Sequence, residues 1–249
     1  MHTQTYKTSL VRPHTSLFGL IDTYLPKLAE RSVFVVTSKV VSLCEDSILK
    51  KNEVASKKEL IQKEADAYII NPHPLPFSDS IQLTIKNNIL IPSAGIDESN
   101  GEDIYILYPK DLKKSAALIW EYIKKRDNLK EVGVIITDSH TTPMRWGVIG
   151  IGLSWCGFKP LYNYIGEPDC FGKPLRVTKR NNLDALAVSA VFCMGEGNEQ
   201  TPFAVITDAP KLEFQDRPPT DVEVQTFSIS MKDDLYAPLL TAANWVFKT

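Results

Sequence analysis

The clearest pattern in the chain is a set of short apolar runs, each of which leads into polar residues. Residues 33–36 form a run of mostly β-branched side chains before Thr37, Ser38 and Lys39. Residues 132–137 form a second run that is closed by Asp138, and residues 203–207 form a third. Short continuous apolar runs rich in β-branched residues are typical of buried strands. We therefore expect three core strands, and polar groups where the first two end.

Helical spacing predicts four helices, at residues 56–70, 111–126, 181–194 and 233–247. In the second, apolar residues recur every three or four positions, at Leu112, Ala116, Ile119 and Ile123. The third is apolar on most faces, which indicates a buried helix that is capped by Asn181 or Asn182 and ended by Gly195. Pro238 is tolerated in the first turn of the fourth helix.

The remaining segments read as turns, short strands and close-packed backbone. Residues 71–80 contain three prolines close together, which excludes regular structure there. Residues 81–85 and 88–92 are two short β-rich pieces, and Lys86-Asn87 between them is a plausible tight turn. Nine of the twelve glycines lie between Gly133 and Gly197, and this density implies bends and close backbone packing in the middle of the chain.

Composition narrows the classes of protein that fit. The chain has 249 residues, 43% hydrophobic and 23% charged, which suits one globular unit or two compact subdomains. A formal net charge of −2 gives no basic footprint for nucleic acid. No apolar run reaches about 18 residues, and the first 20 residues lack the apolar block of a signal peptide. We therefore expect a cytoplasmic protein that binds neither nucleic acid nor membrane.

The cysteines support a reducing environment. They are widely scattered, without a CxxC pair, so a zinc site or a disulfide framework is not expected. The four cysteines are Cys44, Cys156, Cys170 and Cys193. We expect Cys156, Cys170 and Cys193 to be small hydrophobic residues of the core.

Common phosphate-binding motifs are absent. The segment from Gly166 to Lys173 has one residue too many for a Walker loop and continues with Pro174. The glycines at 195 and 197 are not followed by the third glycine of a dinucleotide fingerprint. These results exclude the common nucleotide folds and leave nucleotide binding open.

Three acids stand out by their context. Asp97 follows an apolar strand, Asp138 closes the run at 132–137, and Glu196 lies just beyond the helix at 181–194. Carboxylates at the ends of apolar elements are where Mg²⁺ and Mn²⁺ are held, because these ions take oxygen ligands from carboxylates and substrate phosphates. The alternative is that each acid only caps a turn.

At these same positions the sequence resembles the coenzyme F-420 γ-glutamyl ligases. Five blocks occur in the family's order across roughly residues 30 to 210, which is most of the chain. They are VVTSKVVSLCE at 35–45, AGIDESN at 94–100, VGVIITDS at 132–139, GEPDCFGKPLRVT at 166–178 and MGEG at 194–197.

The resemblance implies an α+β fold of two interlocked subdomains within a single ligase-like domain over residues 1–249, assembled as an intertwined homodimer. It also implies GTP, with ATP as an alternative, and two Mg²⁺ or Mn²⁺ ions per site. Asp97, Asp138 and Glu196 would be catalytic residues and, with Ser139, the metal ligands. The expected nucleotide contacts are Ser38, Lys39, Asn100 and Asp169. The loop from Gly195 to Pro202 would also contact the nucleotide, through Gly195, Gly197 and Asn198.

The implied reaction explains why acids and metals are needed. An acceptor carboxylate attacks the γ-phosphate of the nucleotide, and the amine of L-glutamate then displaces phosphate from the resulting acyl phosphate. The first step brings two anions together, so bridging metals must neutralise phosphate charge. The acceptor would be the deazaflavin coenzyme or another γ-glutamylated cofactor such as a folate.

The chain departs from the family at several basic positions. Leu43 stands where the family has a basic residue, and Asp46 replaces a glycine. In the segment 141–147 only Arg145 remains of three basic residues, so guanidinium groups that suit phosphate or carboxylate are replaced by neutral groups. The family's amino-terminal nucleotide-binding piece is not recognisable in residues 8–18. These losses leave a second hypothesis open, a catalytically inactive, nucleotide-binding dimeric scaffold of the same fold.

Several residues keep a structural alternative. Asp169 either contacts the guanine or fixes the bend between Gly166 and Gly172. Lys39 either binds nucleotide or is a solvated strand end. His140 is expected in a surface turn, since the family needs no histidine there.

Overall fold

A five-stranded sheet forms the centre of the molecule. The computed structural model describes residues 1–70, 81–99 and 101–248. Strands β2 and β8 run parallel, and the other neighbouring strands pair antiparallel. The strand order is β1 (His2–Tyr6), β12 (Phe203–Thr207), β2 (Ser32–Thr37), β8 (Val132–Thr141) and β9 (Val148–Cys156). The three core strands predicted from apolar runs are thus confirmed and lie side by side.

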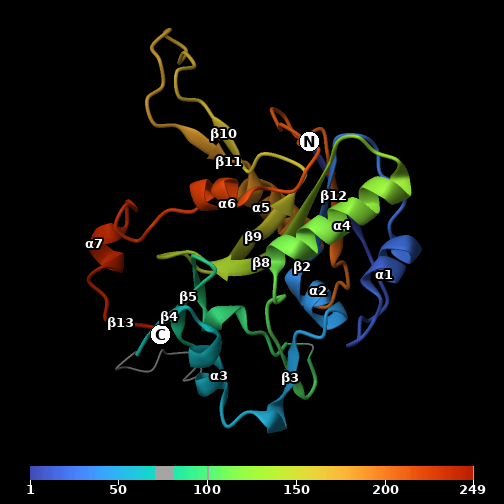
Figure 1. The fold of residues 1–249 in the computed structure, drawn as a ribbon, viewed down its shortest axis with the longest axis vertical. Coiled ribbons are helices and arrows are strands. Elements are labelled where there is room, and N and C mark those ends of the chain that lie inside the picture. The colour runs from blue at the N-terminus through green and yellow to red at the C-terminus, as the bar shows by residue number, and fades with distance from the viewer. Residues whose placement is uncertain (71–80, 100, 249) are drawn as a thin grey trace.

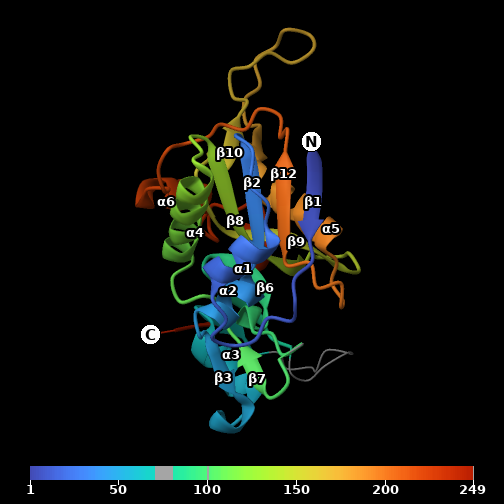
Figure 2. The ribbon, with the colours of Figure 1, turned by 90° about the vertical axis from the view of Figure 1, so that its right-hand side faces the viewer.

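Helices cover both faces of this sheet (Figure 1; Figure 2). Side chains alternate between the faces along a strand, so Phe34 and Val36 pack in one hydrophobic cluster and Val33 and Val35 in another. The first cluster lies under α1 (Leu17–Tyr24), α2 (Ser38–Cys44) and α4 (Leu112–Asp127), and the second under α5 (Asn182–Met194). The predicted helix at 111–126 is confirmed, and Asp111 caps it by accepting a hydrogen bond from the Lys114 N–H.

A smaller α+β region packs beside the central sheet. It contains the helix α3 (Lys57–Glu64), the four-stranded order β13 (Trp245–Phe247), β4 (Ala67–Ile69), β5 (Leu83–Lys86) and β6 (Ile89–Pro92), and the pair β3 (Ile48–Lys50) and β7 (Ile104–Ile106). Two 3₁₀ turns complete it, η1 (Lys51–Glu53) and η2 (Ser93–Gly95). Its own hydrophobic cluster contains Leu60, Ile61, Ala94, Ile96 and Tyr105.

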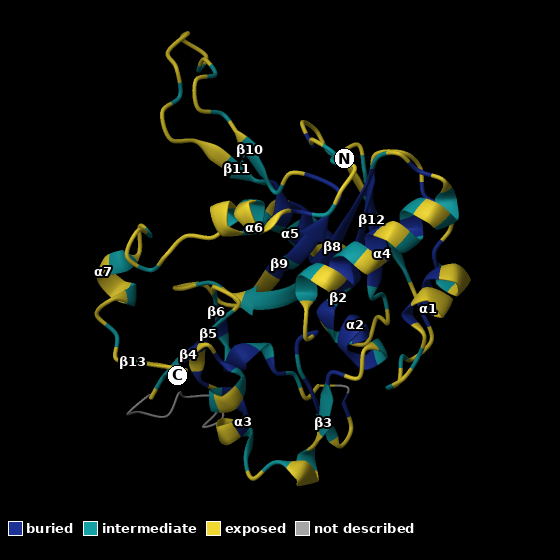
Figure 3. Cartoon of the chain, in the orientation of Figure 1, coloured by how far each residue is buried: buried dark blue, intermediate teal, exposed yellow. Residues whose placement is uncertain are grey.

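A hairpin and a tail extend from these two regions. The hairpin of β10 (Leu161–Asn163) and β11 (Lys179–Asn181) carries a long loop away from the body of the molecule, and its tip is exposed (Figure 3). The tail follows β12 and contains α6 (Asp221–Phe227), α7 (Ala237–Leu240) and β13. Because β13 pairs with β4, the tail links the end of the chain to the smaller region.

Two helix predictions were wrong in extent. The helix predicted at 56–70 ends at Glu64, since Ala65 takes an extended conformation and Tyr68 belongs to β4. The terminal helix predicted at 233–247 is only the four-residue α7, and Trp245 pairs with Ile69 in a strand. In both places, pairing with a strand that is far away in the sequence outweighs the local preference for a helix. The proline-rich stretch predicted to be irregular lies outside the described residues.

The short hairpin was predicted one residue too early. Its turn is Asn87-Asn88, where φ is 52° and 59°. A two-residue hairpin turn of type I′ needs positive φ at both central residues, and asparagine tolerates positive φ better than most residues do.

Burial differs from expectation at three residues. Cys170 and Cys193 are exposed, whereas Cys156 is buried as predicted. Phe192 is 88% exposed, so α5, which was predicted to be a buried helix, is largely buried but presents one open face. Asn181 caps α5 and Gly195 ends it, as the sequence predicts. None of the helices in the described ranges is both long and apolar enough to cross a membrane.

Candidate functional site

The polar ends of two parallel strands create the candidate site. Strand register pairs Thr37 of β2 with Thr137 of β8, so both strands reach the same edge together. Beyond this edge, Lys39 lies in the first turn of α2, and β8 continues through Asp138. A cavity of about 330 Å³ opens there and is lined by Lys39, Asp97, Asp138, Ser139, Glu196 and the loop from Gly195 to Pro202. The three acids singled out in the sequence therefore line one cavity.

Asp97 is held by an ion pair. It follows η2 and is fixed by backbone hydrogen bonds in both directions with Ile106. Its Oδ2 lies 2.5 Å from the Lys39 Nζ, and its Oδ1 accepts a hydrogen bond of 2.6 Å from the Ser99 N–H. Burial alone would raise the pKa of Asp97, but Lys39 and Ser99 together hold that pKa below its usual value.

Asp138 and Glu196 are shifted in the opposite direction. Burial raises the pKa of Asp138 to about 6, although the nearby Tyr108 hydroxyl and the Ser139 N–H oppose the shift, and the charge of Asp97 adds to it. Burial also raises the pKa of Glu196, opposed by a hydrogen bond with Ser139. The charge of Asp97 disfavours the ionised form of both carboxylates, as expected for acids that share a small space.

The donor chemistry of this cavity fits a hard cation. Three carboxylates and the Ser139 hydroxyl offer oxygen ligands, and a divalent cation would remove the charge cost that raises two of the pKa values. Within the described ranges, no three His, Cys, Asp or Glu side chains already stand in a metal-binding arrangement. The Lys39 ammonium instead neutralises Asp97. The site therefore fits a cation that arrives with oxygen ligands of its own, such as a phosphate.

The loop after α5 is shaped by an internal hydrogen bond. Gly195 has φ +80°, and a Cβ there would lie 2.4 Å from the Glu199 Cδ, so only glycine fits. The Glu199 Oε2 accepts a hydrogen bond of 2.8 Å from the Gly197 N–H. Asn198 lines the cavity with these residues.

The amino-terminal segment also contributes, which the sequence did not reveal. Residues 8–11 line this cavity of about 330 Å³, and the Thr8 N–H donates a hydrogen bond to the Gln200 carbonyl. Leu43, which stands at a basic position of the family, lines the same cavity and is buried. Residues 8–11 and Leu43 match no motif of the family, so only the three-dimensional structure shows that they line the cavity.

Two of the expected nucleotide contacts, Ser38 and Asp169, do not line this cavity. Ser38 is buried at the start of α2, and a third expected contact, Asn100, lies outside the described residues. Asp169 lies in the projecting hairpin loop, where its Oδ1 accepts hydrogen bonds from the N–H groups of Phe171 and Lys173 and so fixes the bend. His140 lies on β8 rather than in a turn, because this strand continues to Thr141.

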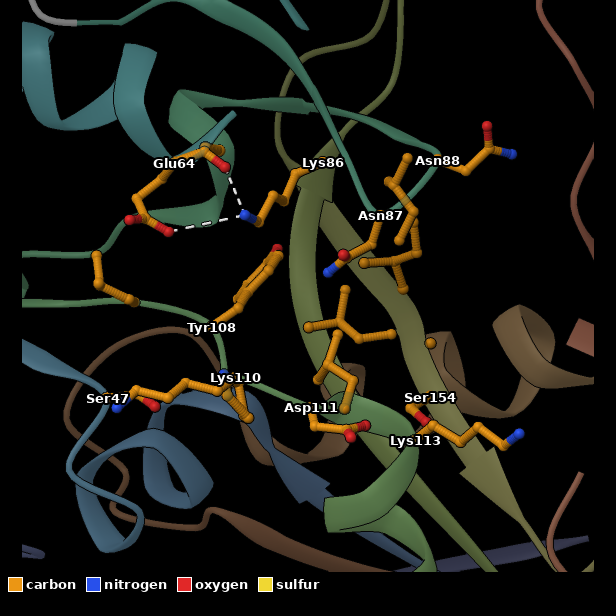
Figure 4. Close-up of a pocket in the computed structure, with 18 of the residues that line it drawn as sticks. Ser47, Glu64, Lys86, Asn87, Asn88, Tyr108, Lys110, Asp111, Lys113 and Ser154 are labelled. Carbon is orange, nitrogen blue, oxygen red and sulfur yellow. Dashed lines mark hydrogen bonds and ion pairs between the residues drawn. The ribbon is translucent and has the colours of Figure 1, made fainter. Parts of the chain in front are cut away.

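A second, larger cavity of about 940 Å³ adjoins the site (Figure 4). Tyr108 lines this cavity and is close enough to Asp138, which lines the smaller one, for the two groups to shift each other's pKa. Ile151, directly opposite Asp138 in the sheet, lines the larger cavity as well. Ile151 and Tyr108 thus bring the wall of the larger cavity close to Asp138, and the sequence gave no reason to single out Tyr108.

Comparison with known proteins agrees with the resemblance of the motifs. Residues 6–208 match the family described as F420-0:Gamma-glutamyl ligase. A coenzyme F420:L-glutamate ligase of Methanococcus maripaludis is 32% identical, with the match covering 78% of this chain and 82% of the relative. A protein of the same name from Methanopyrus kandleri is 30% identical, covering 82% and 85%. The tail from residue 209 onward lies beyond the family match.

Proposed function

Because the chain belongs to the F420-0:γ-glutamyl ligase family, we propose that it joins L-glutamate to a carboxylate of a cofactor, using a nucleoside triphosphate and divalent cations. Membership makes it an acid–amino-acid ligase. The acceptor is coenzyme F420-0 or a related carboxylate such as a folate, and the nucleotide is GTP, with ATP as the alternative. The convergence of Asp97, Asp138 and Glu196 on one cavity is the observation that carries this proposal.

The reaction proceeds in two balanced steps. An oxygen of the acceptor carboxylate forms a bond to the γ-phosphorus, and the bond from that phosphorus to the nucleoside diphosphate breaks. The amine of L-glutamate then forms a bond to the acyl carbon and loses a proton, while inorganic phosphate leaves. The products are the amide between the acceptor carboxyl group and the amine of L-glutamate, nucleoside diphosphate and phosphate. Both steps depend on bringing anionic groups into contact.

The residues of the cavity suit that task. Bound Mg²⁺ or Mn²⁺ would neutralise phosphate charge in the first step. Asp97, Asp138, Glu196 and the Ser139 hydroxyl would hold the two ions, and Lys39 is placed to contact the nucleotide once Asp97 binds a cation. The loop at 195–202 and the segment at 8–11 would enclose the phosphates. Bound cations would lower the pKa values of Asp138 and Glu196, which burial raises in the ligand-free chain.

We also propose that the whole chain forms one ligase-like domain and functions as an intertwined homodimer in the cytoplasm. Several large apolar side chains are more than four-fifths exposed, among them Met144, Phe171, Val177 and Phe192. Exposed apolar side chains in such number are typical of an interaction surface. Sedimentation equilibrium would give a monomer mass if this proposal is wrong.

A product assay tests the function. The protein is incubated with labelled L-glutamate, Mn²⁺ or Mg²⁺, GTP or ATP, and either F420-0 or a reduced folate, and products larger by one glutamate are sought by mass. We expect one acceptor to gain glutamate, only with metal and nucleotide present. Nucleotide binding without any extended product would instead support the inactive scaffold.

A further inference from the structure

Three buried polar groups without partners face the larger cavity. The Ser47 hydroxyl, the Tyr108 hydroxyl and the Trp155 indole nitrogen have no hydrogen-bond partner in the described part of the chain. Their residues are only 3%, 7% and 4% exposed. All three line the cavity of about 940 Å³. A buried polar group without a partner costs about 1–3 kcal/mol, so three around one cavity indicate that a ligand completes them.

The rest of the wall is mixed. Apolar side chains come from the central sheet, the smaller region and the tail, including Ile96, Leu107, Ile151, Leu153 and Phe227. Charged side chains line another part of it, among them Glu64, Lys86, Lys110, Asp111 and Lys113. Ligand sites of about 300–1,000 Å³ combine apolar walls with a few placed polar groups. The volume suits a cofactor-sized molecule, which is much larger than L-glutamate. An indole N–H can only donate, so the ligand must present at least one hydrogen-bond acceptor inside the cavity.

The tail closes one side of this cavity. Phe227 of α6 packs against Trp155 with ring centroids 5.1 Å apart, and Ile229 lines the cavity beyond it. The tail is anchored there by a 2.5 Å ion pair between Lys113 and Asp221 and by the pairing of β13 with β4. Since this wall lies beyond the family match at 6–208, it is a feature of the chain that the family comparison does not describe.

The position of the larger cavity relative to the three acids indicates which molecule it binds. In Figure 4 the Tyr108 ring stands between the Glu64–Lys86 pair and the group of Asp111, Lys113 and Ser154. Asp138, which lines the smaller cavity, lies opposite Ile151 in the sheet, and Ile151 and Tyr108 both line the larger cavity. A molecule in the larger cavity would therefore come near the place where the proposed function puts the γ-phosphate.

We infer that the larger cavity binds the apolar, ring-bearing body of the carboxylate acceptor, and that the tail at 219–229 determines which acceptor fits. The inference rests on the proposed function. Trp155, Tyr108 and Ser47 would hydrogen-bond this body, while its carboxylate extends past Tyr108 toward Asp138. The nucleotide and its cations would occupy the smaller cavity.

Two variants test the cavity without touching the acids. Trp155→Phe keeps the ring against Phe227 and removes only the N–H. Ile229→Trp adds bulk at a side chain that is 52% exposed, and Leu235→Trp, at an 86% exposed tail position that does not line the cavity, is the matched control. Equilibrium dialysis measures the Kd for F420-0 and for GTP with Mg²⁺, and initial rates give the KM for each.

We expect Trp155→Phe to weaken F420-0 binding about tenfold, the loss typical of one hydrogen bond left unmade. Ile229→Trp should also weaken F420-0 binding, because the added ring takes up part of the cavity. GTP binding should stay within about twofold, Leu235→Trp should match the wild type, and the melting temperature of Trp155→Phe should not fall. Weaker GTP binding with unchanged F420-0 binding would assign the cavity to the nucleotide and overturn the inference.

The same experiment separates the inference from the proposed function. If the wild type extends F420-0 but both cavity variants keep its KM, or if the wild type binds no F420-0, the inference is wrong. If F420-0 binds through the cavity and no acceptor gains glutamate, the ligase function fails while the binding site stands.

Discussion

The Nζ of Lys39 lies 2.5 Å from the Oδ2 of Asp97, and this ion pair joins the first turn of α2 to the segment after η2. Lys39 also donates a 3.0 Å hydrogen bond to the Ser99 hydroxyl. The ammonium group thus neutralises one of three converging carboxylates in the ligand-free chain. It leaves Asp138 and Glu196, whose pKa values are raised, as the groups that gain most from a bound cation.

Replacing Lys39 should raise the pKa of Asp97. That pKa is held low in the folded chain, so the ion pair stabilises the fold above the unfolded value of about 3.9, and its contribution is lost as the pH falls through the folded pKa. We expect Lys39→Gln to cost at most about 1 kcal/mol at pH 7, because both side chains are partly exposed, and progressively less as the pH falls from about 3.9 through the folded pKa. Carbon-13 NMR of the Asp97 carboxyl gives its pKa directly. Lys57→Gln, which removes a partner of Glu98 instead, should leave it unchanged.

Asp138→Asn should stabilise the metal-free chain at neutral pH. The folded pKa of about 6 lies above the unfolded value, so the ionised carboxylate costs stability that appears as the pH rises from about 4 through 6. A shift of this size corresponds to about 2–3 kcal/mol. Urea unfolding at pH 8 should show the gain, and unfolding at pH 3.5 should show almost none.

Metal provides the control for that prediction. Adding Mn²⁺ at pH 8 should raise the melting temperature of the wild type more than that of Asp138→Asn, because only the wild type keeps the full set of anionic ligands. A variant that is no more stable than the wild type without metal would contradict the burial of an uncompensated charge.

Gly95→Ala should destabilise the chain more than the same change at Gly147. Both glycines have positive φ, 71° and 93°, so each substitution carries a backbone cost of about 1 kcal/mol. A Cβ at Gly95 would also lie 2.1 Å from the Tyr108 Cζ, whereas nothing lies within 4 Å at Gly147. Displacing a buried aromatic ring adds about 1–3 kcal/mol. If the two variants lose the same free energy of unfolding in urea, the Tyr108 ring can move aside without a cost in stability, and the prediction is wrong.

The core strands and the acids at their ends could be predicted because both are local features. An apolar run followed by an acid identifies a buried strand and its polar end without knowledge of the neighbours. The parallel pairing of β2 with β8 then brings Lys39 and Asp138 to one edge. Asp97 and Glu196 stood out by local context as well, after an apolar strand and after a helix, and the family motifs then implied a common role for all three acids.

The features that were missed depend on distant contacts. Tyr108 reads as an ordinary apolar position, and only the positive φ values at Ser93, Ala94 and Gly95 let the chain fold closely against its ring. The strand at the end of the tail exists because it pairs with β4, which local spacing cannot reveal.

The rate of glutamate incorporation in isosteric acid variants tests the central claim most directly. We predict that Asp97→Asn, Asp138→Asn and Glu196→Gln each lower kcat by about 10²–10³, the loss typical of removing one charge-stabilising group. Glu98→Gln is the matched control, since Glu98 adjoins Asp97 in sequence but pairs with Lys51 and Lys57, and it should keep kcat within about threefold of the wild type. A near-normal kcat in any of the three acid variants, with metal and nucleotide saturating, would contradict the account.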